Sequence, residues 1–276
     1  MGFWVTKQKS IQKKTWNPFS WKLLRKAKEW VYKLLNYIKS ENLKFKRTFT
    51  KKLVIITPLF MLLLAVISGR YFVENGYNWW YSLILPGYLT LITVLVNQNE
   101  EKKLHYRSVF ALPVSLRKTW IYKVLLITAY VAIACGIHLL GIILGILTYN
   151  TKSTITVFQV IEATVLLIVT LLWQIPFCLY LSKKFGMMVT ILINVGGGVI
   201  LDFLAASRSL WWVFPYSWGT RLMIPVLGIL PNGTLAQRGN TLLNPKVIPF
   251  GMILSIILFF LLLTITTSWF SKQEVK

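Results

Sequence analysis

Long apolar runs constrain the fold of this chain more than any other feature. A helix needs roughly 20 predominantly apolar residues to cross a bilayer core of about 30 Å. Six segments meet this requirement, two of them marginally: residues 53–69, 79–96, 121–147, 158–181, 186–206 and 247–270. The last contains no charged residue. The sequence therefore predicts an all-α, polytopic membrane protein with six transmembrane helices.

The basic residues are unevenly distributed, and their placement predicts the orientation. The net charge is +23, which in a soluble protein would suggest nucleic acid, but 15 of the 31 Lys and Arg residues precede residue 53. With six spans, 25 of the 31 fall on the side of the amino terminus, and cytoplasmic segments of membrane proteins are enriched in Lys and Arg. We therefore expect both termini in the cytoplasm and no nucleic-acid partner. Four tryptophans at the expected outer boundary fit an aromatic belt: Trp79, Trp80, Trp211 and Trp212.

The basic amino-terminal region, residues 1–52, contains a predicted amphipathic helix. Asn17 is a suitable N-cap, Pro18 suits the first helical position, and apolar residues then recur on one face up to residue 38. We favour a helix lying on the inner membrane surface against anionic lipid headgroups. A solvated helix packed on another subunit is the alternative. Because the first long apolar run starts only at residue 53, we expect no removable signal peptide.

Motifs for catalysis or metal binding are missing from the sequence. It contains no Gly-Lys dipeptide, so it lacks the phosphate-binding loop of an ATPase, and it has no His-Glu-x-x-His motif. We therefore expect no enzymatic activity, no metal and no cofactor in this chain. Isolated small or polar residues inside the apolar runs are interpreted as helix-packing residues: Cys135, His138, Cys178, Gly196, Gly197 and Gly198.

A short polar segment, residues 97–120, separates the second and third predicted spans. Tyr106, Val109, Phe110 and Pro113 follow helical spacing, and Ser115 can cap a new helix after the proline. The segment is therefore predicted to form a stiff cytoplasmic elbow that could dock into a groove on a partner. An ordinary polar loop is the alternative.

Four strings in the sequence resemble the lantibiotic immunity ABC transporter permease family. They are NYIKSENLKFKRTFTKKL, YNWWYSLILPGYLTL, LPVSLRKTWIYK and FPYSWGTRLMIPVLGILPNG, and the resemblance covers about residues 35–270. It implies the membrane subunit of a type-2 ABC exporter in a bacterial cytoplasmic membrane. It also implies a separate ATPase subunit that binds ATP, a second related permease or a second copy of this chain, and expulsion of a lantibiotic-type peptide for self-immunity.

On this view the 97–120 elbow is the coupling helix. Its location and amphipathic pattern suggest five residues that contact the ATPase: Glu100, Glu101, Arg107, Leu112 and Pro113. The domain organisation is then a 53–270 permease domain between the basic 1–52 region and a short cytoplasmic tail, 271–276.

The predicted outer half contains the candidate substrate path. Glu162 and Asp202 lie in apolar runs, where acids are costly and are often functional, so both could meet a cationic peptide. Structural ion pairs with Arg208 or Arg221 are an equally weighted alternative. The outer segment 207–246 is too broken by proline and glycine for a clean span and is predicted to be interfacial or re-entrant. Its Trp211 and Trp212 are further substrate-path candidates.

Three functions remain open at this stage. The first is an ABC exporter permease for a lantibiotic-type peptide, or for another amphipathic substrate. The second is a membrane sensor or scaffold that binds the peptide without transporting it. The third, which we least favour, is an intramembrane enzyme.

Overall fold

The computed structural model describes residues 48–99, 115–148 and 153–273, together with scattered residues between 25 and 45. Within these ranges every regular element is helical, and the only β-type pairing is an isolated bridge between Ile229 and Leu235. The α-helices are α2 (Phe49–Ile67), α3 (Phe72–Trp79), α4 (Leu85–Gln98), α6 (Leu116–Thr148), α7 (Val157–Leu171), α8 (Gln174–Ile191), α9 (Gly198–Ala205), α10 (Trp218–Leu227) and α11 (Val247–Ser271).

Shorter elements join these helices. Two are π-helices, η2 (Trp80–Ile84) between α3 and α4 and η4 (Leu192–Gly197) between α8 and α9. Four are 3-10 helices: η1 (Gly69–Tyr71), η5 (Trp211–Val213), η6 (Pro215–Ser217) and η7 (Thr241–Leu243). The two π-helices widen otherwise continuous α-helical stretches, a feature often found at functional sites.

Five helical stretches in the described part of the chain are long and apolar enough to cross a membrane. They are Phe49–Ile67, Gly69–Gln98, Leu116–Thr148, Val157–Ala205 and Val247–Ser271. All six predicted spans fall within these stretches, apart from a residue or two at their ends. The count differs because the predicted spans 158–181 and 186–206 belong to one helical run of 49 residues.

That 49-residue run folds back on itself at Gly186. A straight helix would place residues 174 and 194 about 30 Å apart, yet the side-chain amide of Asn194 donates a hydrogen bond of 3.0 Å to that of Gln174. Gly186 has φ 84° and ψ −179°, a conformation open essentially to glycine alone. One residue therefore reverses the chain without an intervening loop.

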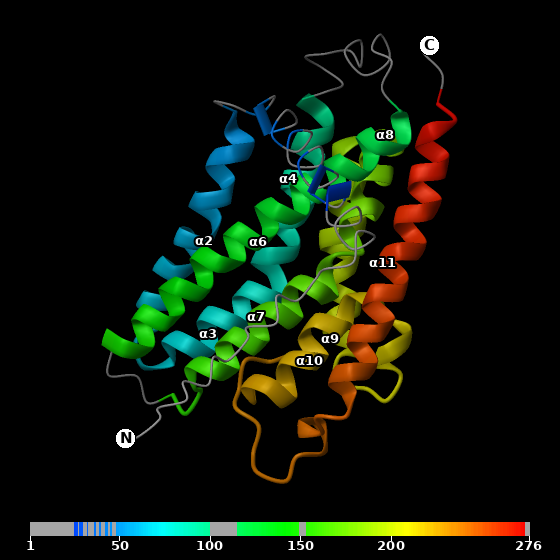
Figure 1. Cartoon of the computed structure of the whole chain (residues 1–276). Coiled ribbons are helices and arrows are strands. Elements are labelled where there is room, and N and C mark those ends of the chain that lie inside the picture. Colours follow the sequence, from blue (N-terminus) through cyan, green and yellow to red (C-terminus); the bar gives the residue numbers. More distant parts are fainter. Residues whose placement is uncertain are drawn as a thin grey trace, which may run out of the picture.

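The helices form an elongated bundle with two distinct ends (Figure 1). At the upper end in Figure 1, α2 and α6 begin and α4 and α11 finish; at the lower end lie α3, α9, α10 and the first residues of α11. Within the bundle α2 packs on α6, α4 packs on α8, and α10 packs on α7.

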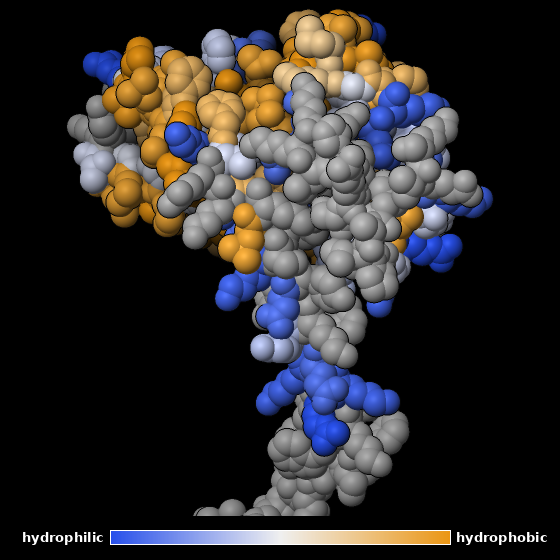
Figure 2. All heavy atoms as spheres, turned by 90° about the horizontal axis from the view of Figure 1, so that it is seen from above, coloured by the Kyte–Doolittle hydropathy of each residue, from blue (hydrophilic) through white to orange (hydrophobic). Residues whose placement is uncertain are grey.

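The flanks of the bundle are apolar. The surface of α11 is an example, because Ile253, Ile257, Phe260, Leu261 and Ile265 are all exposed. Figure 2, which looks onto the upper end, shows orange apolar side chains over much of the described surface, with blue hydrophilic side chains among them. Exposed apolar surface on this scale requires a lipid or protein environment.

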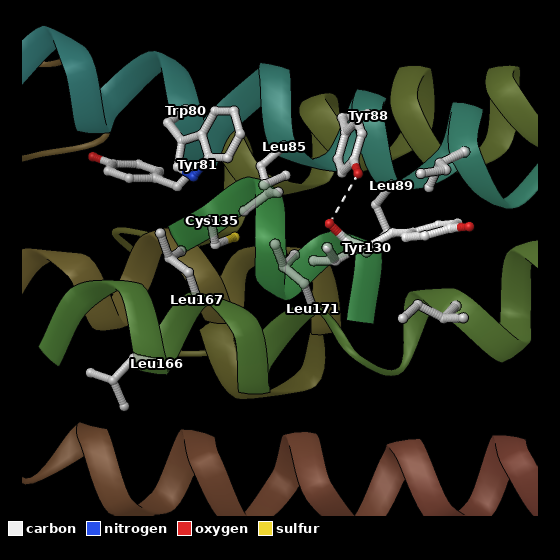
Figure 3. Packing of buried hydrophobic residues seen from close by; sticks show 14 of the residues in the cluster. Trp80, Tyr81, Leu85, Tyr88, Leu89, Tyr130, Cys135, Leu166, Leu167 and Leu171 are labelled. Atoms are coloured by element: carbon white, nitrogen blue, oxygen red, sulfur yellow. Dashed lines mark hydrogen bonds between the residues drawn. The ribbon is translucent and has the colours of Figure 1, made fainter. Parts of the chain in front are cut away.

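The core lies between η2 and α4 on one side and α6 and α7 on the other (Figure 3). Trp80 and Leu85 point toward Cys135 of α6 and Leu167 of α7. Farther along, the hydroxyl of Tyr88 donates a hydrogen bond of 3.1 Å to the carbonyl oxygen of Tyr130. Cys135 and Cys178 are both buried and unpaired, in agreement with their predicted packing role.

Only two of the four tryptophans of the predicted aromatic belt are exposed. Trp79 and Trp212 are about half exposed, as a belt requires, but Trp80 and Trp211 are buried. Trp80 stacks on His138 with 4.5 Å between ring centroids, and Trp211 meets Phe250 edge-on at 6.0 Å. For these two residues the belt interpretation is wrong, because their rings fill gaps between helices.

Most of the predicted amino-terminal helix lies outside the described residues. Arg25, Lys26, Lys28, Glu29 and Lys39 are described, and each is helical and exposed. The predicted ATPase-coupling residues, Glu100, Glu101, Arg107, Leu112 and Pro113, also lie outside the described part of the chain.

Replacing Gly186 with alanine tests the reversal. No atom would lie within 4 Å of the added Cβ, so any cost comes from the backbone conformation. We expect Gly186→Ala to lower the free energy of unfolding by about 1–3 kcal/mol, measured by denaturation in mixed detergent micelles. Gly136→Ala is the control, since this glycine also has open space but sits inside α6. Equal stability of the two variants would contradict the assignment.

Candidate functional site: a buried carboxylate beside an apolar cavity

Asp202 is the buried acid at the lower end of the bundle. It lies on α9, and only 8% of the residue is exposed. Its Oδ2 accepts a hydrogen bond of 2.6 Å from the hydroxyl of Thr220 on α10. Its Oδ1 is enclosed and has no hydrogen-bond partner among the described residues. Burial of a carboxylate with one oxygen unpaired is costly, so this group calls for an explanation.

The glycine that begins α9 brings this helix close to η6 and thereby positions Asp202. A Cβ added to Gly198 would come within 2.8 Å of Cδ1 of Tyr216. Because the chain continues from Tyr216 directly into α10, this close approach also brings Thr220 next to Asp202. The predicted packing role of the glycine run is confirmed for Gly198, whereas Gly196 and Gly197 have open space around them.

A cavity of about 250 Å³ lies between α9 and the α3–η2 segment, and Asp202 forms part of its wall. Trp79 is 49% exposed and Phe203 is 69% exposed, so the cavity lies near the apolar flank of the bundle. The residues that line it are Asn78, Trp79, Ser82, Leu83, Val199, Asp202, Phe203 and Pro231.

Asn78 and Ser82 provide the other polar groups of the cavity. The side-chain oxygen of Asn78 accepts a hydrogen bond of 2.9 Å from the hydroxyl of Tyr81, and the Ser82 hydroxyl donates one of 2.6 Å to the Asn78 carbonyl. The loop after α10 packs closely against Asn78. A Cβ added to Gly233 in this loop would lie 2.9 Å from Nδ2 of Asn78. The cavity thus combines three polar side chains with apolar and aromatic walls.

The sequence left open that Asp202 and Glu162 form ion pairs with Arg208 or Arg221. Among the described residues, however, the one ion pair joins Arg25 and Glu29. Arg208 instead donates to the carbonyl oxygen of Leu204 at 2.9 Å, and Arg221 donates to that of Leu242 at 2.8 Å. Burial lowers the pKa of Arg221. Both arginines are thus engaged by backbone carbonyls.

The other predicted substrate-path residues lie apart from the cavity wall. Glu162 is half-buried on α7. Trp211 is buried against Phe250, with the guanidinium carbon of Arg221 5.8 Å from its ring centroid. Trp212 is partly exposed, and its carbonyl oxygen accepts a hydrogen bond from the indole of Trp218. The structure therefore brings only Asp202, of these four, to the cavity.

Glu74 is a second buried acid in the lower half. It lies in the first turn of α3, is 3% exposed, and has an Oε2 without a hydrogen-bond partner among the described residues. It does not line the Asp202 cavity. Its position at a helix N-terminus is favourable for a negative charge.

A polar network centred on Asn194 crosses the bundle next to the site. The side-chain amide of Asn194 donates to Thr90 at 2.7 Å and to Gln174 at 3.0 Å, and it accepts from the hydroxyl of Tyr216 at 3.2 Å. These bonds connect η4 with α4, α8 and η6. Burial raises the pKa of Tyr216, which keeps its hydroxyl a donor. Sequence reasoning missed this network; a single Asn inside an apolar run was the available signal.

His138 has the packing role that the sequence predicted. Its Nε2 lies 3.1 Å from the carbonyl oxygen of Gly76 on α3, which forms an interhelical hydrogen bond, and its ring is held between Trp80 and Tyr77. Among the described residues no group of three His, Cys, Asp or Glu side chains could hold a metal ion.

Aromatic rings and lysines cluster at the upper end of the bundle. Nζ of Lys123 lies 5.5 Å from the Trp120 ring centroid and 5.7 Å from that of Phe270, and Nζ of Lys183 lies 5.4 Å from the Phe270 centroid. The Trp120 indole also donates to Thr266 at 3.1 Å. These contacts join α6, α8 and α11 at the end where the 97–120 segment enters α6.

Comparison of this chain with known protein families, with curated proteins and with solved structures found no match.

The Asn194 network predicts a measurable loss of stability. Asn194→Ala removes three hydrogen bonds between elements and should lower the free energy of unfolding by about 1–2 kcal/mol, measured in mixed detergent micelles. Asn244→Ala, at an exposed site with one local hydrogen bond, should change it by only a few tenths of a kcal/mol. If the Asn194 variant lost no more than this control, the network would not stabilise the bundle.

Proposed function

We propose that this protein is the permease subunit of an ABC exporter that expels a lantibiotic-type antimicrobial peptide from the bacterial cytoplasmic membrane. A separate ATPase subunit binds ATP and drives transport, and a second permease, related or identical, completes the membrane part. The producer cell thereby protects itself from the peptide.

A membrane arrangement with six crossings and both ends in the cytoplasm underlies this proposal. Five apolar helical stretches support it, together with the reversal at Gly186, which divides the 49-residue run into two antiparallel limbs. A helix of that length would measure about 74 Å if straight, far more than a bilayer core of about 30 Å. The Lys and Arg bias supports an orientation with the upper end of the bundle inside.

The observation that carries the proposal is the cavity at Asp202. With the upper end inside, the cavity lies in the outer half of the membrane, near a flank that lipid would cover. An unpaired carboxylate oxygen behind aromatic and apolar walls suits a cationic, amphipathic peptide that reaches the protein from the outer leaflet. The broken outer segment, including α10, covers the same end of the bundle.

Force from the ATPase would enter at the opposite end. The 97–120 elbow leads directly into α6, which continues for 33 residues to the lower end, so a push on the elbow can reach the outer half through one rigid helix. The aromatic and lysine contacts of Trp120 and Lys123 tie the start of that helix to α11.

A peptide-binding sensor or scaffold without transport is the second candidate, because the same cavity would serve binding alone. Export of another amphipathic substrate would also use it. Coupling to ATP hydrolysis separates transport from binding.

The coupling prediction concerns the acids of the elbow. Glu100→Lys together with Glu101→Lys should lower peptide-stimulated ATP turnover about tenfold or more, because charge reversal at a docking surface weakens the complex. Turnover is measured on the complex of this chain with the ATPase that co-purifies with it.

The matched control for this experiment is Glu29→Lys, which reverses an exposed acid in the basic amino-terminal region. It should leave turnover near that of the unaltered complex. Unchanged turnover in the elbow variant, or failure of any ATPase to co-purify with the unaltered chain, would contradict the proposed transport role.

A further inference from the structure

We propose that the cavity at Asp202 binds one primary ammonium group, presented by a lysine side chain of the amphipathic peptide. The identity of the molecule rests on the proposed function, whereas the charge and shape of the group rest on the cavity itself.

The charge follows from Asp202. Its carboxylate is more than nine-tenths buried, one oxygen is bound only by the Thr220 hydroxyl, and no cationic side chain among the described residues forms an ion pair with it. A bound cation would offset the cost of this burial. A lysine ammonium has three donors and no acceptor. Asp202, Ser82 and Asn78 line the cavity, and their side-chain oxygens are the acceptors that we assign to these donors.

The geometry favours an ammonium over a guanidinium. Arginine binds a carboxylate best through two parallel hydrogen bonds, one to each oxygen. In this site Oδ2 already accepts the Thr220 hydroxyl at 2.6 Å, so a guanidinium bond to that oxygen would compete with Thr220, whereas Oδ1 has no partner among the described residues. A compact ammonium needs only that one oxygen, so the cavity should discriminate lysine from arginine.

The apolar walls suit the methylene stem of lysine. Leu83, Trp79 and Phe203 line the route from the flank of the bundle, and long charged side chains bury their stems against such surfaces. The Trp79 ring can also contribute a cation–π contact. Because Oδ1 is enclosed, entry requires a rotation of wall side chains, and the exposed Trp79 and Phe203 have space for it.

Peptide binding to the purified full-length chain tests this inference. The chain is held in micelles of an uncharged maltoside detergent, which brings no amine. The probe is a fluorescent, amino-terminally acetylated amphipathic helical peptide with a single lysine; matched peptides carry acetyl-lysine or arginine instead. The lysine peptide should bind about tenfold to a hundredfold more tightly than both. Asp202→Asn should remove this preference.

Two further variants separate the site from general effects. Glu162→Gln removes another acid of the lower half that lies outside the cavity, and it should leave the lysine preference intact. Val199→Phe fills the cavity and leaves Asp202 in place, and it should remove the preference. Thermal unfolding checks that each variant is folded; asparagine can still accept the Thr220 hydrogen bond.

Three results would overturn the inference. One is equal binding of the lysine and acetyl-lysine peptides to the unaltered chain. Another is an equal loss of lysine preference in Asp202→Asn and Glu162→Gln. The third is displacement of the peptide by phosphatidylethanolamine in the unaltered chain but not in Asp202→Asn, which would assign the site to a lipid ammonium. This binding assay contains no ATPase. If the chain failed to couple to an ATPase but still bound the lysine peptide selectively, the proposed function would be refuted and the ammonium site would be retained.

Discussion

A bilayer interior supplies no hydrogen-bonding partner, and the protein must therefore satisfy its polar groups from within. Asn194 shows how this requirement shapes the bundle. Its amide can bond to Gln174 only because Gly186 reverses the chain between them, and its remaining bonds reach α4 and η6. Helices far apart in the sequence are thus joined by a polar side chain inside an apolar interior.

Among the described residues, the buried acids Asp202 and Glu74 meet this requirement only in part, and Asp202 is the one that lines a cavity. Thr220 binds one carboxylate oxygen, but the other faces no donor among the described residues, although nearby polar groups such as Ser82 and Tyr81 are bonded. A bound cation, as we propose, would offset the cost of burying this charge. Its location beside the exposed rings of Trp79 and Phe203 is compatible with the proposed ligand, which would arrive through lipid.

Hydropathy predicted the helical stretches closely, because a bilayer demands long apolar runs and these contrast clearly with the polar segments between them. Hydropathy also predicted two separate spans, 158–181 and 186–206, although the chain reverses at Gly186 without a loop between them. The burial of Trp80 and Trp211 was not predictable, since tryptophan suits both a membrane boundary and a packed core. Partners of Asn194 were equally hidden, since Thr90 lies 104 residues away. Asp202 was predictable because an acid in an apolar run is rare; its cavity depends on how α3 and α9 pack, which periodicity does not encode.

Sidedness is the point on which the transport account depends, and cysteine labelling in intact cells measures it most directly. Cys135 and Cys178 are buried, so single cysteines introduced at Lys103 and at the exposed Gln237 can be followed with an impermeant maleimide. The account predicts that the residue-237 cysteine is labelled in intact cells, while the residue-103 cysteine is labelled only after the membrane is opened. Labelling of residue 103 in intact cells would place the elbow outside, away from any ATPase, and would contradict the account.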